Sequence, residues 1–147
     1  MRVLGLDVGD VRIGVALSDE TATIAGGLPT LARVGPRKDV RAVVALVHEH
    51  EVEEVVVGLP RRLDGTLGPQ AEKVQAFATE LRQSVRVPVR EWDERFTSVL
   101  ATRTLIEGGV RRRDRKYSVD KVAAVLILQG FLDHRKRASP ATGESPE

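Results

Sequence analysis

The chain opens with Val3-Leu4-Gly5-Leu6-Asp7-Val8-Gly9, an apolar run short enough for one buried β-strand and interrupted by a single carboxylate. Gly9 and Asp10 supply a turn before a second apolar run at residues 12–17, so the two runs predict a β-hairpin. Successive side chains of a strand point to opposite faces, which places Asp7 on the same face as Gly5 and Gly9. That face carries little bulk around the carboxylate.

The rest of the chain alternates between strand and helix patterns. Residues 25–34 predict a weaker third strand, because two glycines and Pro29 interrupt it. Apolar spacing predicts helices at about 36–50 and 71–81, each followed by a strand, at 53–57 and at 85–92, where Pro88 suggests an edge position. Two more helices are expected, at about 97–107, capped by Thr97 or Ser98, and at about 118–134, with Ser118 as N-cap after a basic loop.

This order of elements predicts an α/β fold with a mixed five-stranded sheet and about four flanking helices. Strands 1 to 3 should be antiparallel, and strands 4 and 5, which helices connect, should be parallel to strand 1. The 147 residues fit one domain, expected at residues 1–137, and the Ser-, Pro-, Gly- and Glu-rich tail at 138–147 should be disordered. Without a signal-peptide pattern or about 18 consecutive apolar residues, we expect a cytoplasmic protein with no membrane partner.

Three acidic positions stand in apolar or helix-starting settings: Asp7, the pair Asp93-Glu94 after the last strand, and Asp120 in the first turn of the last helix. An ionised carboxylate in an apolar element costs several kcal/mol unless a positive group lies beside it. The chain has no cysteine, so a metal site would use oxygen or histidine ligands. Convergence of the three positions on Mg²⁺ or Mn²⁺ is therefore the functional hypothesis, with Glu94 or, alternatively, Asp93 as the middle ligand.

Each acid also has a structural interpretation. Asp7 could cap the turn that follows it or pair with Arg12 across the hairpin. Asp120 could simply complement the helix dipole, and Asp93-Glu94 could begin the next helix with Arg95 neutralising the pair. The joint pattern favours function, because separated acids that converge without a cation would repel one another.

The basic residues are mostly arginine, 18 of the 23, and arginine's planar fork suits phosphate. A dense run, Arg111-Arg112-Arg113-Asp114-Arg115-Lys116, lies just before Asp120 and predicts contacts with a nucleic-acid backbone, together with Arg12 and Arg95. A solvated face, or an arginine-rich genome, is the structural alternative.

Four blocks of this sequence, in order, closely resemble the YqgF (RuvX) family. They are Leu4-Gly5-Leu6-Asp7-Val8-Gly9 with residues 12–19, Val57-Gly58-Leu59-Pro60 with Asp64-Gly65, Asp93-Glu94-Arg95 with Thr97-Ser98, and Val119-Asp120 with residues 123–129. The resemblance implies an RNase H-like three-layer fold, similar to RuvC Holliday junction resolvases. It also implies a bacterial cytoplasmic nuclease that matures the 5′ end of pre-16S rRNA, with Asp7, the acid of the middle block and Asp120 holding the metal. Arg61-Arg62 stands where relatives more often carry apolar or amide residues, and Thr97-Ser98 varies the usual hydroxyl pair.

Several functions stay open at this stage. A metal-dependent phosphodiester hydrolase could act on precursor rRNA or, as a junction resolvase, on branched DNA. A non-catalytic module binding rRNA or the transcription machinery is a second class. A phosphotransferase related to actin, hexokinase and heat-shock ATPases is a third, suggested by the hairpin at residues 5–17, but the chain is too short for its two domains. One or two metal ions, and a monomer or a homodimer, fit equally well.

Overall fold

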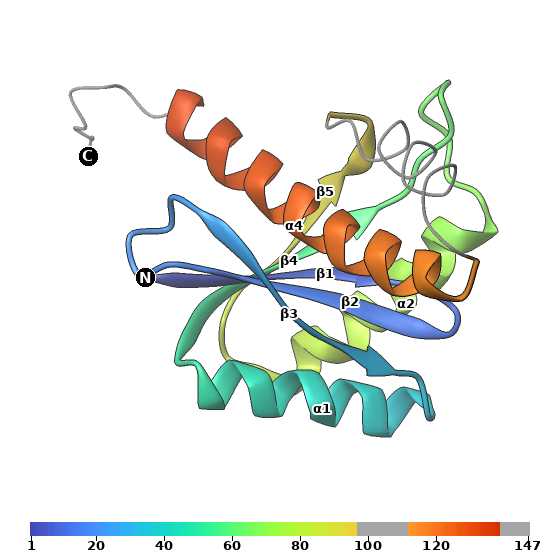
Figure 1. Ribbon diagram of the computed structural model, residues 1–147, viewed down its shortest axis with the longest axis horizontal. Coiled ribbons are helices and arrows are strands. Elements are labelled where there is room, and N and C mark those ends of the chain that lie inside the picture. Colours follow the sequence, from blue (N-terminus) through green and yellow to red (C-terminus); the bar gives the residue numbers. More distant parts are fainter. Residues whose placement is uncertain (97–111, 139–147) are drawn as a thin grey trace.

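The computed structural model describes residues 1–96 and 112–138, with side chains of the last helix described from residue 122 onward. The elements, in chain order, are β1 (Arg2–Val8), β2 (Arg12–Ser18), β3 (Ala25–Ala32), α1 (Pro36–Glu49), β4 (Val52–Leu59), α2 (Pro69–Ser84), β5 (Val89–Asp93), the 3₁₀ helix η1 (Glu94–Phe96) and α4 (Arg112–Ala138). Figure 1 shows a central sheet with helices on both faces.

The predicted mixed sheet is confirmed. Its strand order is β3-β2-β1-β4-β5, with β1 antiparallel to β2, β2 antiparallel to β3, and β4 parallel to both β1 and β5. The edge strands are β3, which contains Pro29, and β5, which follows Pro88. Proline has no N–H to donate, so these positions disturb no interior pairing.

Three layers enclose two apolar cores. Leu4, Leu6 and Val8 of β1 pack with α1 and α2 on one face of the sheet, whereas Val3 packs with α4 on the other. Gly5 lets α4 come close, because a Cβ there would lie 2.7 Å from the Leu128 Cβ atom. Asp7 therefore lies on the α4 face, as the strand alternation predicted.

The structure corrects the boundaries of some elements. Helix α4 begins at Arg112, so Ser118 is not its N-cap, and residues 112–116 belong to the helix and not to a loop. Arginine and lysine are good helix formers, and neither glycine nor proline separates residue 112 from residue 118. Asp120 consequently lies more than two turns inside the helix, and the argument from the helix dipole no longer applies to it.

Other differences are smaller. Strand β5 begins at Val89 and not at residue 85, and β4 covers Val52–Leu59. The helix expected at 97–107 and the hydroxyl pair Thr97-Ser98 lie outside the described residues, as do residues 139–147 of the tail expected at 138–147. Ala138 is the last residue of α4. Within residues 1–96 and 112–138, none of the helices has the length and apolar character that a bilayer crossing requires.

Candidate functional site

The candidate site lies where three parallel strands end. The carboxyl ends of β1, β4 and β5 meet at one edge of the sheet, which is where α/β proteins commonly bind ligands. A pocket of about 260 Å³ opens there, lined by Asp7, Val8, Gly9, Asp10, Pro60, Gln70 and Glu94. The structure thus brings Asp7 of β1 and Glu94 of η1, 87 positions apart in the sequence, to the same cavity.

Asp7 is buried near the end of β1, with only 7% of its surface exposed. Its neighbour on β2 is Gly14, and the turn after β1 closes through the Gly9 N–H, which donates to the Arg12 carbonyl at 2.9 Å. The residue paired with Asp7 on the neighbouring strand thus has no side chain, and the hydrogen bond holds the turn closed. The hairpin therefore presents Asp7 at the cavity wall.

Glu94 reaches the same cavity because β4 carries a glycine beneath it. A Cβ on Gly58 would lie 3.0 Å from the Glu94 Oε2 atom and 2.4 Å from the Ile127 Cδ1 atom. The Glu94 side chain thus occupies the space that any larger residue at position 58 would fill, and only 5% of Glu94 is exposed. Gly58 also follows Val57, the β4 partner of Leu6, so it lies beside the end of β1.

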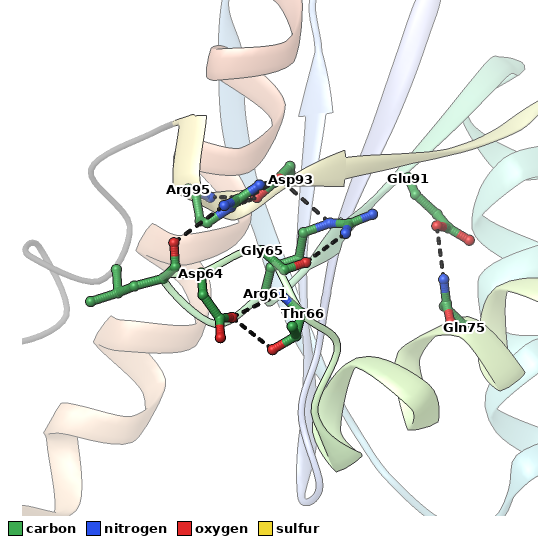
Figure 2. A network of polar contacts seen from close by, with 9 residues as sticks. Arg61, Asp64, Gly65, Thr66, Gln75, Glu91, Asp93 and Arg95 are labelled. Atoms are coloured by element: carbon green, nitrogen blue, oxygen red, sulfur yellow. Dashed lines mark hydrogen bonds and ion pairs between the residues drawn. The ribbon is translucent and has the colours of Figure 1, made fainter.

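Asp93 is not among the residues that line this cavity. Its carboxylate accepts hydrogen bonds from the Arg95 backbone N–H at 2.9 Å and from Arg95 Nη2 at 2.8 Å, and Arg61 Nε lies 3.4 Å away (Figure 2). The hydrogen bonds from Arg95 lower the pKa of Asp93 below its ordinary value, and the charges of Arg95 and Arg61 act in the same direction. The structure therefore separates the acid pair that the sequence left open: Glu94 lines the pocket, and Asp93 binds arginine.

The third predicted acid, Asp120, falls on α4 one turn before Ala124. The Ala124 carbonyl oxygen would lie 3.4 Å from a Cβ on Gly5, so this part of the helix runs over β1 toward Asp7. The side chain of Asp120 is outside the described set. So are the side chains of Arg112, Arg113, Arg115 and Lys116 and the whole of Arg111, while Arg12 begins β2 opposite Ala32 of β3.

Sequence reasoning missed three residues of the site. Gln70, at the start of α2, lines the pocket and donates through Nε2 to the Val8 carbonyl oxygen at 3.3 Å. Asp10 lines the pocket beside Lys73, whose Nζ lies 3.4 Å from its Oδ1 atom. Arg61 joins the Asp93 network. No local sequence pattern identifies these residues as part of a site. The glycine-containing loop between β4 and α2, which includes Gly65, is the only sequence feature of this segment that indicates a functional loop.

The donor atoms of the pocket fit a hard divalent cation. Two nearly buried carboxylates, Asp7 and Glu94, line one small cavity, and a chain without cysteine offers no thiolate to compete for a softer metal. Among the side chains that the structure describes, no cluster of three or more acidic or histidine residues could hold a metal ion, and Asp120 is not among them. Asp7 and Glu94 thus line the same pocket, and their role as metal ligands stays a prediction.

The fold of this chain is similar to that of several solved structures. Thermus thermophilus RuvC, solved in complex with a Holliday junction substrate, is similar with a TM-score of 0.60 at 15% identity, over 94% of this chain and 97% of that one. The fowlpox virus Holliday junction resolvase is similar with a TM-score of 0.51 at 12% identity, over 91% and 99%. The expected RNase H-like, RuvC-like fold is therefore confirmed.

Relatives at the sequence level are much closer. A protein of Caldanaerobacter subterraneus subsp. tengcongensis is 51% identical over 139 residues, which cover 94% of this chain and all of the relative. One of Moorella thermoacetica is 52% identical over 133 residues, covering 90% and 95%. Both carry the name "Putative pre-16S rRNA nuclease". The family model described as "RuvX: Holliday junction resolvase" matches residues 1–134, and the chain belongs to the RuvX family.

Proposed function

We propose that this protein is a metal-dependent nuclease that hydrolyses a phosphodiester bond at the 5′ end of pre-16S rRNA. The observation that carries the proposal is the convergence of Asp7 and Glu94, both nearly buried, on one pocket at the carboxyl edge of the sheet. The names of the close relatives support pre-16S rRNA as the substrate, and a cytoplasmic location is part of this proposal. A monomer and a homodimer are both compatible with this function.

Asp7, Glu94 and Asp120 would hold Mg²⁺ or Mn²⁺. A bound divalent ion supplies positive charge that makes water a better nucleophile and stabilises the oxygen that leaves phosphorus. The protein's own contribution is orientation: Asp7 is positioned by the β1–β2 hairpin, and Glu94 extends over Gly58, where no side chain blocks it. Because both carboxylates lie in a poorly solvated cavity, their attraction for a cation is stronger than it would be in water.

Positive residues around the pocket would hold the negatively charged strand. Arg12 and Arg95 lie on the segments that follow the two acid-bearing strands, and residues 111–116 lead into or begin α4. Arginine donates planar pairs of hydrogen bonds to phosphate, which aligns the backbone as well as neutralising it. We assign these residues to substrate binding and the three acids to the metal.

A branched DNA is the second candidate substrate. The description of the family model favours it, and a four-way junction presents the same phosphodiester group to the same acids. Cleavage-site mapping on a pre-16S rRNA transcript and on a DNA four-way junction, side by side, distinguishes the two. A single cut at the mature 5′ end of the RNA supports the proposal, whereas symmetrical cuts in the junction alone would replace it with a resolvase.

The acids are tested by conservative substitution. Asp7→Asn and Glu94→Gln keep shape but remove charge, so each should lower the rate of RNA cleavage in Mg²⁺ or Mn²⁺ at least about 100-fold. Each should also weaken Mn²⁺ binding measured by calorimetry. Asp133→Asn, which removes an exposed carboxylate from the far half of α4, is the matched control and should cleave like the wild type.

Two results would contradict this assignment. Cleavage by Asp7→Asn at the wild-type rate would remove Asp7 from the mechanism. Absence of both cleavage and Mn²⁺ binding in the wild-type protein, with RNA binding retained, would make the protein a non-catalytic rRNA-binding module.

A further inference from the structure

Two arginines that directly follow pocket-lining residues in the sequence share one carboxylate. Pro60 and Glu94 line the cavity, and the residue after each of them is an arginine, Arg61 and Arg95. Both guanidinium groups turn to Asp93, with Arg61 Nε at 3.4 Å and Arg95 Nη2 at 2.8 Å from its Oδ2 atom (Figure 2). Two segments distant in the sequence thus place their positive charges side by side next to the candidate active site.

The loop that carries Arg61 is held in a fixed shape. Arg61 and Leu67 form an isolated antiparallel bridge, and the Arg62 N–H donates to the Thr66 carbonyl at 3.0 Å. Gly65 has φ of 90°, a conformation that glycine adopts without strain, and its carbonyl accepts from Arg61 Nη1 at 2.9 Å. A further bond, from Arg95 Nη1 to the Leu63 carbonyl at 3.4 Å, ties this loop to η1.

Each guanidinium retains N–H groups for a ligand. An arginine side chain has five N–H donors. Within residues 1–96 and 112–138, Arg95 directs Nε and Nη2 to Asp93 and one Nη1 hydrogen to Leu63, and Arg61 directs Nε to Asp93 and one Nη1 hydrogen to Gly65. The remaining hydrogens lie on side chains that are 31% and 34% exposed, so solvent and a substrate can reach them.

The charge of this cluster is positive. Asp64 also acts electrostatically on Arg95, and Arg62 acts on Asp64, so Asp93 and Asp64 carry two negative charges against the three of Arg61, Arg62 and Arg95. The cluster has a net charge of +1, beside a pocket whose lining includes three acids. A carboxylate that holds both arginines fixes their rotamers before a ligand arrives, and less conformational freedom is then lost on binding. Such a pair is suited to the tetrahedral oxygens of phosphate.

We propose that Arg61 and Arg95, oriented by Asp93, form a binding site for a phosphodiester group of the substrate strand adjacent to the bond that is cleaved. The inference rests on the proposed nuclease function and adds Arg61 to the substrate-binding residues. It also gives Asp93 the role of a positioning residue, which acts through the two arginines and does not hold the metal.

Binding measured without metal tests the site independently of cleavage. The probe is a fluorescein-labelled RNA that spans the 5′ boundary of 16S rRNA, titrated in EDTA over a range of KCl concentrations. Arg61→Ala and Arg95→Ala should each weaken binding about tenfold, and each should lower the slope of log Kd against log salt by about 0.7 to 0.9. Arg61→Lys should restore the slope but not the full affinity, because lysine keeps the charge and loses the fork.

Arg86→Ala is the matched control. Arg86 is exposed and precedes β5, at the opposite end of that strand from Asp93, so its loss removes the same charge far from the pocket. It should leave the affinity and the salt slope close to those of the wild type. Melting temperatures of all variants confirm that the loop variants are folded before binding is compared.

Wild-type affinity and salt slope in both Arg61→Ala and Arg95→Ala would overturn the proposed site, even if the protein proves to be a nuclease. A wild-type protein that binds RNA through these arginines but cleaves nothing would instead reject the nuclease function and retain the site. The two failures are therefore distinguishable.

Asp93 is tested by Asp93→Asn, which keeps an acceptor oxygen but removes the charge that both arginines share. We expect unchanged Mn²⁺ affinity, a kcat about tenfold lower because the arginines are less well oriented, and a KM that does not rise because one negative charge has gone. Loss of Mn²⁺ binding would make Asp93 a metal ligand. A wild-type kcat would show that Asp93 does not orient the two arginines for catalysis. Either result overturns the positioning role.

Discussion

At the scale of single residues, the candidate site depends on the direction in which each side chain points. Asp93 and Glu94 are neighbours with the same charge, yet one binds Arg95 and Arg61 while the other lines the pocket beside Asp7. Asp93 ends β5 and Glu94 begins η1, and the two side chains point in different directions, so only Glu94 lines the cavity. The glycine at position 58 then decides how far Glu94 can reach.

Gly58→Ala should disturb both stability and the site. The added Cβ would lie 2.4 Å from Ile127 Cδ1 and 3.0 Å from Glu94 Oε2, so the free energy of unfolding should fall by about 1 to 3 kcal/mol. Mn²⁺ affinity should fall as well, because Glu94 is displaced. Urea denaturation and calorimetry measure the two effects.

The same change on an edge strand supplies the control. A Cβ on Gly26 would come no closer than 4.0 Å to the Leu17 carbonyl oxygen, so Gly26→Ala should leave Mn²⁺ affinity unchanged. Ile127→Val removes the Cδ1 atom and should recover part of the stability lost in Gly58→Ala. If that double variant were no more stable than Gly58→Ala alone, the Ile127 contact would not be the cause of the loss.

At the scale of elements, α4 determines how tightly the sheet is covered. Its buried stripe, Ala123, Ala124, Ile127, Leu128 and Leu132, lies over the glycines of β1 and β4. Small residues on both sides allow this close approach. The close packing of α4 thus depends on glycines that the two central strands carry.

The observed start of α4 makes a prediction about Ser118. If Ser118 were an N-cap, replacing it by alanine would lower the free energy of unfolding by about 1 kcal/mol. Because it lies inside the helix, Ser118→Ala should change that free energy by no more than about 0.5 kcal/mol, and alanine's higher helix propensity favours a small gain. Urea denaturation measures the difference, and a loss of 1 kcal/mol or more would support a helix that begins at residue 118 instead.

At the scale of the whole molecule, one buried carboxylate joins the sheet to the helical layer. Asp39 of α1 is 3% exposed and accepts hydrogen bonds from the Val34 N–H at 2.9 Å and from Arg33 Nε at 2.7 Å, next to β3. Burial opposes the ionised form, but these hydrogen bonds and the charge of Arg33 outweigh it and hold the pKa of Asp39 below its ordinary value of 3.8. Asp39 thus stabilises the folded protein in its ionised form.

The stability of the protein should consequently depend on pH through Asp39. A group whose pKa is lower in the folded state than in the unfolded chain stabilises the fold above its unfolded pKa, and this contribution is lost as pH falls through the folded value. Asp39→Asn should lower the free energy of unfolding by about 1 to 3 kcal/mol at neutral pH, and its difference from the wild type should shrink below about pH 4.

Urea denaturation at a series of pH values provides the measurement. Asp133→Asn removes an exposed carboxylate and serves as the control for the general effect of charge. A difference between Asp39→Asn and the wild type that stayed constant down to the acid limit of the folded protein would show that the ionised Asp39 contributes nothing specific.

The sequence by itself determined the order of the strands and helices, the mixed sheet, the edge position of β5 and the face of β1 that carries Asp7. These features follow from local rules, because the spacing of apolar residues and the length of each connection can be read from residues that are close in the sequence. It could not place the start of α4, since good helix formers continue the helix without a stop signal. Only the tertiary structure decided that Glu94 and not Asp93 lines the pocket together with Asp7, that Gly58 makes room for Glu94, and that Arg61 lies beside Arg95 at Asp93. Those contacts depend on strand register and on where a loop returns in space, which distant residues fix together.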